Sequence, residues 1–67
     1  MYYKYVVNHQ ILAILYGQAD YGYGGYLEIV KTFPNSIEPF QVGVKEFFYS
    51  RLNCISPLTD LEKIKYL

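Results

Sequence analysis

Nine tyrosines in a chain of 67 residues are the feature that most limits how this sequence can fold. A phenol ring is large and flat, and its hydroxyl needs a hydrogen-bond partner once it is buried. A chain this short buries only about 60% of the surface that its unfolded form exposes. Nine rings exceed what such a core holds with every hydroxyl bonded, so we expect several tyrosines at the surface or in an interface.

Other sources of stability are scarce in this chain. Cys54 is the only cysteine and His9 is the only histidine, so neither an internal disulfide nor a structural metal site is expected. The length allows one domain, residues 1–67, with a single core. Association with another chain is the remaining route by which a small domain gains stability.

Charge is balanced along the chain, since six basic and six acidic residues give a formal net charge of zero. Nucleic-acid-binding proteins usually carry a basic face and mimics of DNA are strongly acidic, so the composition disfavours a nucleic-acid partner. A protein without net charge also associates readily with other proteins.

The apolar runs are short. The longest, residues 11–16, has six residues, whereas a membrane-spanning helix needs about 20. We expect no membrane insertion, and no secretory signal because Asn8, His9 and Gln10 interrupt the early apolar stretch. One unpaired cysteine is typical of a reducing compartment, so we expect a cytoplasmic location.

Three segments have the composition of strands. Residues 2–7 are aromatic and β-branched, and residues 26–33 alternate between apolar and polar side chains. Residues 40–44 follow Pro39 and are expected to form a short last strand. The glycine-rich residues 17–25 predict a loop between strands.

Residues 10–16 have two interpretations. In the first, Asn8 caps a short helix that ends at Gly17. In the second, Asn8 and His9 form a tight turn into a buried strand. The short length of the segment slightly favours the strand, because a helix of so few residues is marginal.

A change of period predicts a helix over residues 44–53 that lies on the sheet. Its apolar side consists of residues spaced by three and four: Val44, Phe47, Phe48, Leu52 and Ile55. Because Phe47, Phe48 and Tyr49 are consecutive, one side of a helix cannot bury all three. Tyr49 is therefore expected to face solvent or a partner.

A final helix is indicated by two start signals. Ser56 is followed by Pro57, and Thr59 is followed three residues later by Glu62, which makes a capping box. An apolar residue recurs at every third position, as a stripe expected to end exposed or against a partner: Leu58, Leu61, Ile64 and Leu67. These elements predict an α+β fold, a small antiparallel sheet of three or four strands covered by one or two C-terminal helices.

The Tyr-Gly segment over residues 21–26 is the first candidate site. A dinucleotide-binding fingerprint would require glycine at position 27, where Leu27 stands. The segment also lacks the glycine and lysine spacing of a phosphate-binding loop. Tyrosine and glycine together are typical of protein-recognition loops. The residues expected to contact a partner are Tyr21, Tyr23 and Tyr26, followed by Tyr2 and Tyr49.

A second candidate is the N-terminal group of Tyr2, Tyr3 and Tyr5 around Lys4, which resembles a platform for stacking unpaired bases. Strand alternation argues against it, because Tyr3 and Tyr5 then point into the core while Tyr2 stays outside.

Catalysis has one candidate pair, Cys54 as nucleophile and His9 as base, with Asp20 or Asp60 to orient the histidine. Nothing in the sequence places these residues together. We therefore expect that the chain is not an enzyme and that it binds neither a metal nor a cofactor.

The composition favours a non-enzymatic protein-interaction module, such as a small regulator, inhibitor or accessory subunit. It would dock on a larger protein through exposed tyrosines or form a homo-oligomer. The alternative is a single-stranded nucleic-acid-binding protein that uses the N-terminal tyrosines.

Overall fold

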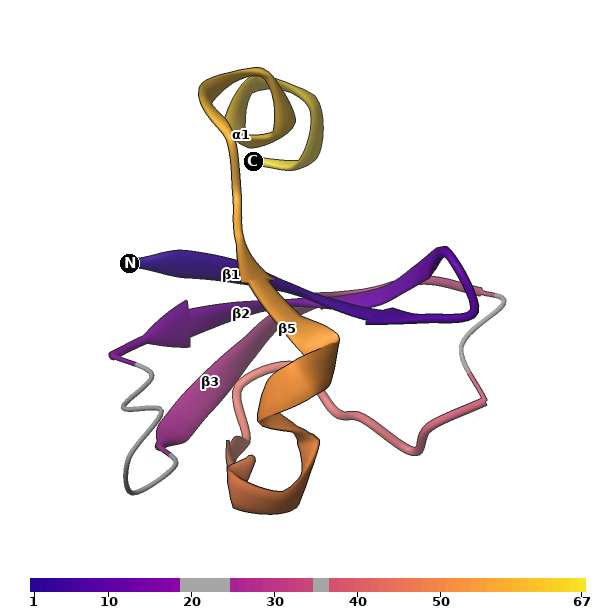
Figure 1. The fold of residues 1–67 in the computed structure, drawn as a ribbon, viewed down its shortest axis with the longest axis vertical. Coiled ribbons are helices and arrows are strands. Elements are labelled where there is room, and N and C mark those ends of the chain that lie inside the picture. Colours follow the sequence, from indigo (N-terminus) through magenta and orange to yellow (C-terminus); the bar gives the residue numbers. More distant parts are fainter. Residues whose placement is uncertain (19–24, 35–36) are drawn as a thin grey trace.

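A five-stranded antiparallel sheet forms the centre of the molecule in the computed structural model, which describes residues 1–18, 25–34 and 37–67. The strand order is β4-β3-β2-β1-β5. The strands are β1 (Tyr2–Val7), β2 (Gln10–Gly17), β3 (Tyr26–Thr32), β4 (Lys45–Phe47) and β5 (Ile55–Pro57). The expected small antiparallel sheet with a C-terminal helix is confirmed, with more strands than predicted (Figure 1).

The turn between β1 and β2 decides between the two interpretations of residues 10–16. Asn8 and His9 have φ angles of 52° and 66°, which is the backbone of a two-residue hairpin turn with both central residues left-handed. Asparagine tolerates this conformation better than most residues. The segment is therefore a strand, and Leu12 to Leu15 in its middle are fully buried.

One face of the sheet carries the main core. Tyr3 and Tyr5 point from β1 into this core and are 2% exposed. Phe48 and the 3-10 helix η1 (Tyr49–Cys54) lie over the same face, with the partly buried Phe40 (Figure 1). The buried cluster consists of Tyr3, Tyr5, Leu12, Ala13, Leu15, Leu27, Ile29, Phe48 and Ile55.

Two expectations for the middle of the chain are wrong. Residues 40–44 are not a strand, and no α-helix covers residues 44–53, because that segment contains β4 and η1. Backbone pairing with β3 prevails here: the Ile29 N–H donates to the Val44 carbonyl at 2.9 Å, and β4 continues this pairing. The apolar residues spaced by three and four do not lie on one buried side, since Val44 and Phe47 are exposed.

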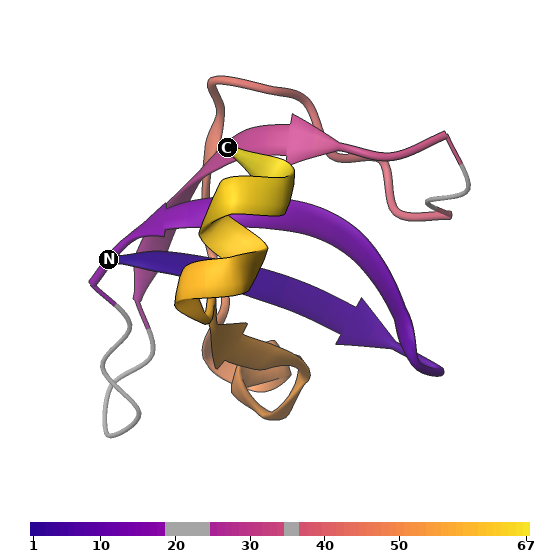
Figure 2. The same ribbon diagram turned by 90° about the horizontal axis from the view of Figure 1, so that it is seen from above.

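The opposite face of the sheet is covered by α1 (Asp60–Tyr66), which lies across β1 and β2 (Figure 2). The expected capping box is confirmed: the Glu62 N–H donates to the Thr59 hydroxyl and the Thr59 N–H donates to the Glu62 carboxylate. Ser56 and Pro57 belong to β5, so they do not start the helix. Proline is tolerated in β5 because it is an edge strand.

Within the described part of the chain, an ion pair and an aromatic pair hold α1 against β1 and against the residue that follows β3. The Lys4 ammonium lies 2.6 Å from the Glu62 carboxylate, and the rings of Phe33 and Tyr66 meet edge to face at 5.7 Å. No residue of α1 itself is buried. The helix is thus held by a clamp of one ion pair and one aromatic pair.

We expect Thr59→Ala to loosen α1 with little effect on the sheet, because it removes the side-chain acceptor for the Glu62 N–H. Loss of such a cap costs about 1 kcal/mol. Hydrogen exchange at the amides of α1 should rise while exchange in β1 and β2 stays unchanged. Equal acceleration in the sheet would contradict the separate attachment of this helix.

Acid should release the clamp. The hydrogen bond from Lys4 lowers the pKa of the Glu62 carboxyl, with a smaller contribution from the backbone N–H of Thr59. The folded state therefore favours the ionised carboxylate. Its stabilising effect is present above the ordinary glutamate pKa and is lost as pH falls through the lowered value.

Thermal midpoints measured from neutral pH to about pH 2 check this expectation. Glu62→Gln should remove part of the acid-dependent loss seen in the wild type. Asp60→Asn, in the same helical turn, is the matched control and should leave most of that loss in place. Identical profiles for Glu62→Gln and the wild type would contradict the clamp.

Candidate functional site

The described tyrosines are divided between the core and the surface, as expected for a chain with more tyrosine than its core can hold. Tyr3 and Tyr5 are buried, and Tyr2 and Tyr66 are partly buried. Tyr16, Tyr26 and Tyr49 are exposed. The expectation that Tyr3 and Tyr5 point inward while Tyr2 stays outside is confirmed. Tyr21 and Tyr23 lie outside the described residues.

Three exposed aromatic rings gather at one place and form the candidate site, here named the aromatic row. Tyr26, Phe47 and Tyr49 are 68%, 47% and 60% exposed. The centroids of Tyr26 and Phe47 are 5.0 Å apart, and those of Phe47 and Tyr49 are 6.1 Å apart with ring planes 7° from parallel. The row therefore presents neighbouring rings on one continuous surface.

Local backbone structure explains why these rings face outward. Tyr26 opens β3 and lies opposite Phe47, the last residue of β4. Phe48 is 0% exposed, and its N–H donates to the Gly25 carbonyl at 3.1 Å, which fixes the end of β4 against the start of β3. Because Phe48 turns into the core, its two chain neighbours turn away from it.

The structure brings together some of the residues expected to contact a partner. Tyr26 and Tyr49 both belong to the aromatic row, and the expected outward orientation of Tyr49 is confirmed. Tyr2 packs instead against Tyr16, with centroids 4.7 Å apart. The spacing of the apolar residues placed Phe47 on the buried side of a predicted helix, so Phe47 was not expected in the site. Alternation along Phe47, Phe48 and Tyr49 is the signal that identifies it.

Arg51 lies beside the row, where its guanidinium donates to the Phe47 carbonyl at 3.4 Å, and its positive charge is compensated. The guanidinium of Arg51 is 4.4 Å from the centroid of the Phe48 ring. Two carboxylates approach it, Glu46 at 3.4 Å and Glu38 at 4.0 Å. Arg51 is therefore paired within the chain, and it adds little positive potential to the surface beside the row.

Burial also affects the phenol of Tyr5, which donates a 3.4 Å hydrogen bond to Glu38. Its pKa is raised, first by burial and then by the negative charge of Glu38, although Arg51 opposes the shift. The neutral phenol is favoured in the folded state, so Tyr5 acts as a core residue with an internal partner.

The N-terminal platform does not form one exposed surface. The rings of Tyr3 and Tyr5 lie in the core. Lys4 points to the other face of the sheet, where it binds Glu62. Tyr2 alone remains accessible among the tyrosines of this group, and only partly.

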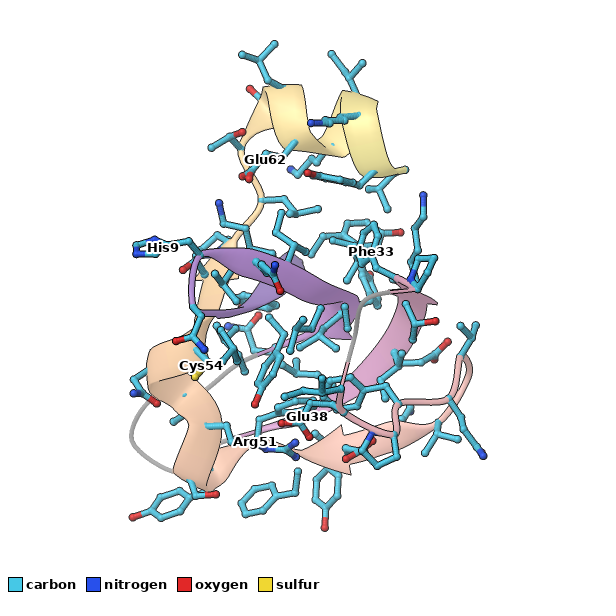
Figure 3. The ribbon with its side chains drawn as sticks, turned by 90° about the vertical axis from the view of Figure 1, so that its right-hand side faces the viewer. His9, Phe33, Glu38, Arg51, Cys54 and Glu62 are labelled. Carbon is cyan, nitrogen blue, oxygen red and sulfur yellow. The ribbon has the colours of Figure 1, made fainter. Side chains whose placement is uncertain are left out.

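The structure does not join the pair considered for catalysis. His9 lies in the β1–β2 turn and points outward, while Cys54 lies at the end of η1 (Figure 3). Among residues 1–18, 25–34 and 37–67, no three metal-ligating side chains gather and no pocket is found. Within the same ranges, no helix is long and apolar enough to cross a membrane.

Comparisons with known proteins do not place this chain in a family. No family model, no curated protein and no solved structure matches it.

Proposed function

We propose that this chain is a non-enzymatic protein-interaction module, a small regulator, inhibitor or accessory subunit that docks on a larger protein through exposed tyrosines. The contact surface is the aromatic row of Tyr26, Phe47 and Tyr49. The observation that carries the proposal is the gathering of these exposed rings on one surface while Tyr3, Tyr5 and other residues already fill the core.

Ring packing supports the role of this surface in binding. Each ring of the row touches another, so their side-chain freedom is already reduced before a partner arrives. Rigid aromatic side chains lose little conformational entropy on contact, and they dominate the energy of many interfaces. The row therefore has the properties of a binding hot spot.

The surroundings of the row indicate the chemistry of the partner. Lys45 lies opposite Glu28 in the strand register, and Arg51 is paired with Glu38 and Glu46. A neutral aromatic surface suits an apolar groove in the partner. Hydrogen-bond acceptors at the rim of that groove would receive the hydroxyls of Tyr26 and Tyr49.

Single-stranded nucleic acid suits the row less well. Stacked bases need aromatic rings, which are present, but they also need cations along the phosphate backbone. The arginine nearest the row is neutralised by two carboxylates, and the formal net charge is zero. A protein partner is therefore the better match.

We predict that the double variant Tyr26→Ala/Tyr49→Ala loses its main protein partner. Wild-type and variant chains would be used as bait in extract from the native host, with captured proteins quantified by mass spectrometry. The dominant partner should fall by about tenfold or more, as expected for the loss of hot-spot rings. Retention of that partner at wild-type levels would refute the assignment of the row.

Tyr16→Ala is the matched control, because Tyr16 is an exposed tyrosine outside the row. It should capture the partner as well as the wild type does. Circular dichroism and thermal melting of each variant establish that the fold is intact. If Tyr16→Ala loses the partner equally, general exposure of tyrosine, and not the row, is responsible.

A second measurement separates protein from nucleic acid. We expect labelled single-stranded oligonucleotides to show no anisotropy change with the wild-type chain at low salt, because Arg51 beside the row is already paired with two carboxylates and phosphate contacts there would need a free cation. Binding that weakens steeply with added salt and disappears in Tyr26→Ala/Tyr49→Ala would instead favour the nucleic-acid alternative.

A further inference from the structure

Arg51 of η1 lies beside the aromatic row and folds back over the residue that the row is built around. Its main-chain N–H donates to the Phe48 carbonyl at 2.9 Å, which closes a turn of the 3-10 type. The backbone leaves helical angles at Arg51 itself, where φ is −122° and ψ is 17°. The guanidinium lies over the Phe48 ring, 4.4 Å from its centroid.

The side chain of Arg51 joins η1 to β4 and to the segment that precedes β4. Its Nη2 atom donates to the Phe47 carbonyl and to the Glu46 carboxylate, each at 3.4 Å. Its Nη1 atom lies 4.0 Å from the Glu38 carboxylate (Figure 3). Each of these polar contacts is 3.4 Å or longer, so the whole set positions the guanidinium. A planar group with several donors can serve a carbonyl and two carboxylates while it stacks on a ring.

The two rings at this end of the row flank Phe48 in the chain. Phe48 is 0% exposed, whereas its neighbours Phe47 and Tyr49 are exposed, with ring planes 7° from parallel. Arg51 covers the Phe48 ring and binds the Phe47 carbonyl. The Phe40 ring closes the other side of this contact, 6.1 Å from the Phe48 centroid and 5.8 Å from the guanidinium. Arg51 therefore fixes the two residues from which the exposed rings extend.

We propose that Arg51 is the positioning residue of the aromatic row. Its guanidinium holds Phe47 and Phe48 so that the Phe47 and Tyr49 rings stay parallel and exposed. Arg51 acts through these residues and not by contact with the partner. The consequence for partner binding rests on the proposed function of the row, whereas the effect on the rings is measurable in the chain alone.

Two substitutions separate the shape of the guanidinium from its charge and from its bulk. Arg51→Met keeps a long apolar side chain but removes the charge and the donors. Arg51→Lys keeps the charge but loses the planar fork that serves several acceptors at once. The row should therefore lose its order in Arg51→Met and lose part of it in Arg51→Lys.

Nuclear Overhauser cross-peaks between the Phe47 and Tyr49 rings of the full chain measure this order. The cross-peaks should fall severalfold in Arg51→Met, while those between the Tyr2 and Tyr16 rings, whose centroids are 4.7 Å apart, stay unchanged. Unchanged Phe47–Tyr49 cross-peaks in Arg51→Met overturn the proposal. If Arg51→Met also loses the Tyr2–Tyr16 cross-peaks, and so does not fold, Arg51→Lys decides. Wild-type Phe47–Tyr49 cross-peaks in Arg51→Lys overturn the role of the planar guanidinium.

Lys4→Met is the matched control, because Lys4 is a cation of similar side-chain exposure, 24% against 27% for Arg51, and also pairs with a carboxylate. Lys4 binds α1, so this variant should loosen the helix and leave the Phe47–Tyr49 cross-peaks at wild-type strength. Equal weakening in Lys4→Met would show that the row responds to any loss of stability, and it would overturn the assignment to Arg51.

Capture from host extract separates this inference from the proposed function. Arg51→Met retains all three rings of the row, yet it should capture about fivefold less of the dominant partner. Reduced capture with the Phe47–Tyr49 cross-peaks intact would show direct contact between Arg51 and the partner, and it would overturn the positioning role. Full capture by Tyr26→Ala/Tyr49→Ala refutes the proposed function alone, because the cross-peaks still decide what Arg51 does.

Discussion

A sheet has two faces, and this short chain must cover both with the segments that follow β3. The first face receives Phe40, Phe48 and η1, whose side chains join Tyr3 and Tyr5 in one apolar core. Among the described residues, the second face receives the seven-residue helix α1, attached through Lys4–Glu62 and Phe33–Tyr66. With so little material, the chain leaves Tyr26 of β3 and Phe47 of β4 exposed on the sheet, and it leaves the outer side of α1 exposed as well. The exposed aromatic row follows from that shortage.

Local signals in the sequence were sufficient for several elements. The β-branched and aromatic composition of β1, the alternation in β3 and the Thr59–Glu62 capping box each depend on neighbouring residues, and each was predicted. Long-range pairing was not predictable: β4 exists because it pairs with β3, and β5 because it returns to β1. In the site, Tyr26 was expected from the Tyr-Gly segment, and Tyr49 was expected because one side of a helix cannot bury three consecutive aromatic residues. Phe47 was missed because its exposure depends on Phe48 entering the core.

The folded monomer encloses Tyr3 and Tyr5 and leaves Tyr26 and Tyr49 accessible. Photochemically induced nuclear polarisation with a dissolved flavin dye measures this directly, because only accessible tyrosine rings become polarised. At low protein concentration we expect strong signals from Tyr26 and Tyr49 and none from Tyr3 and Tyr5. Silent Tyr26 and Tyr49 rings, or polarised Tyr3 and Tyr5 rings, would contradict it.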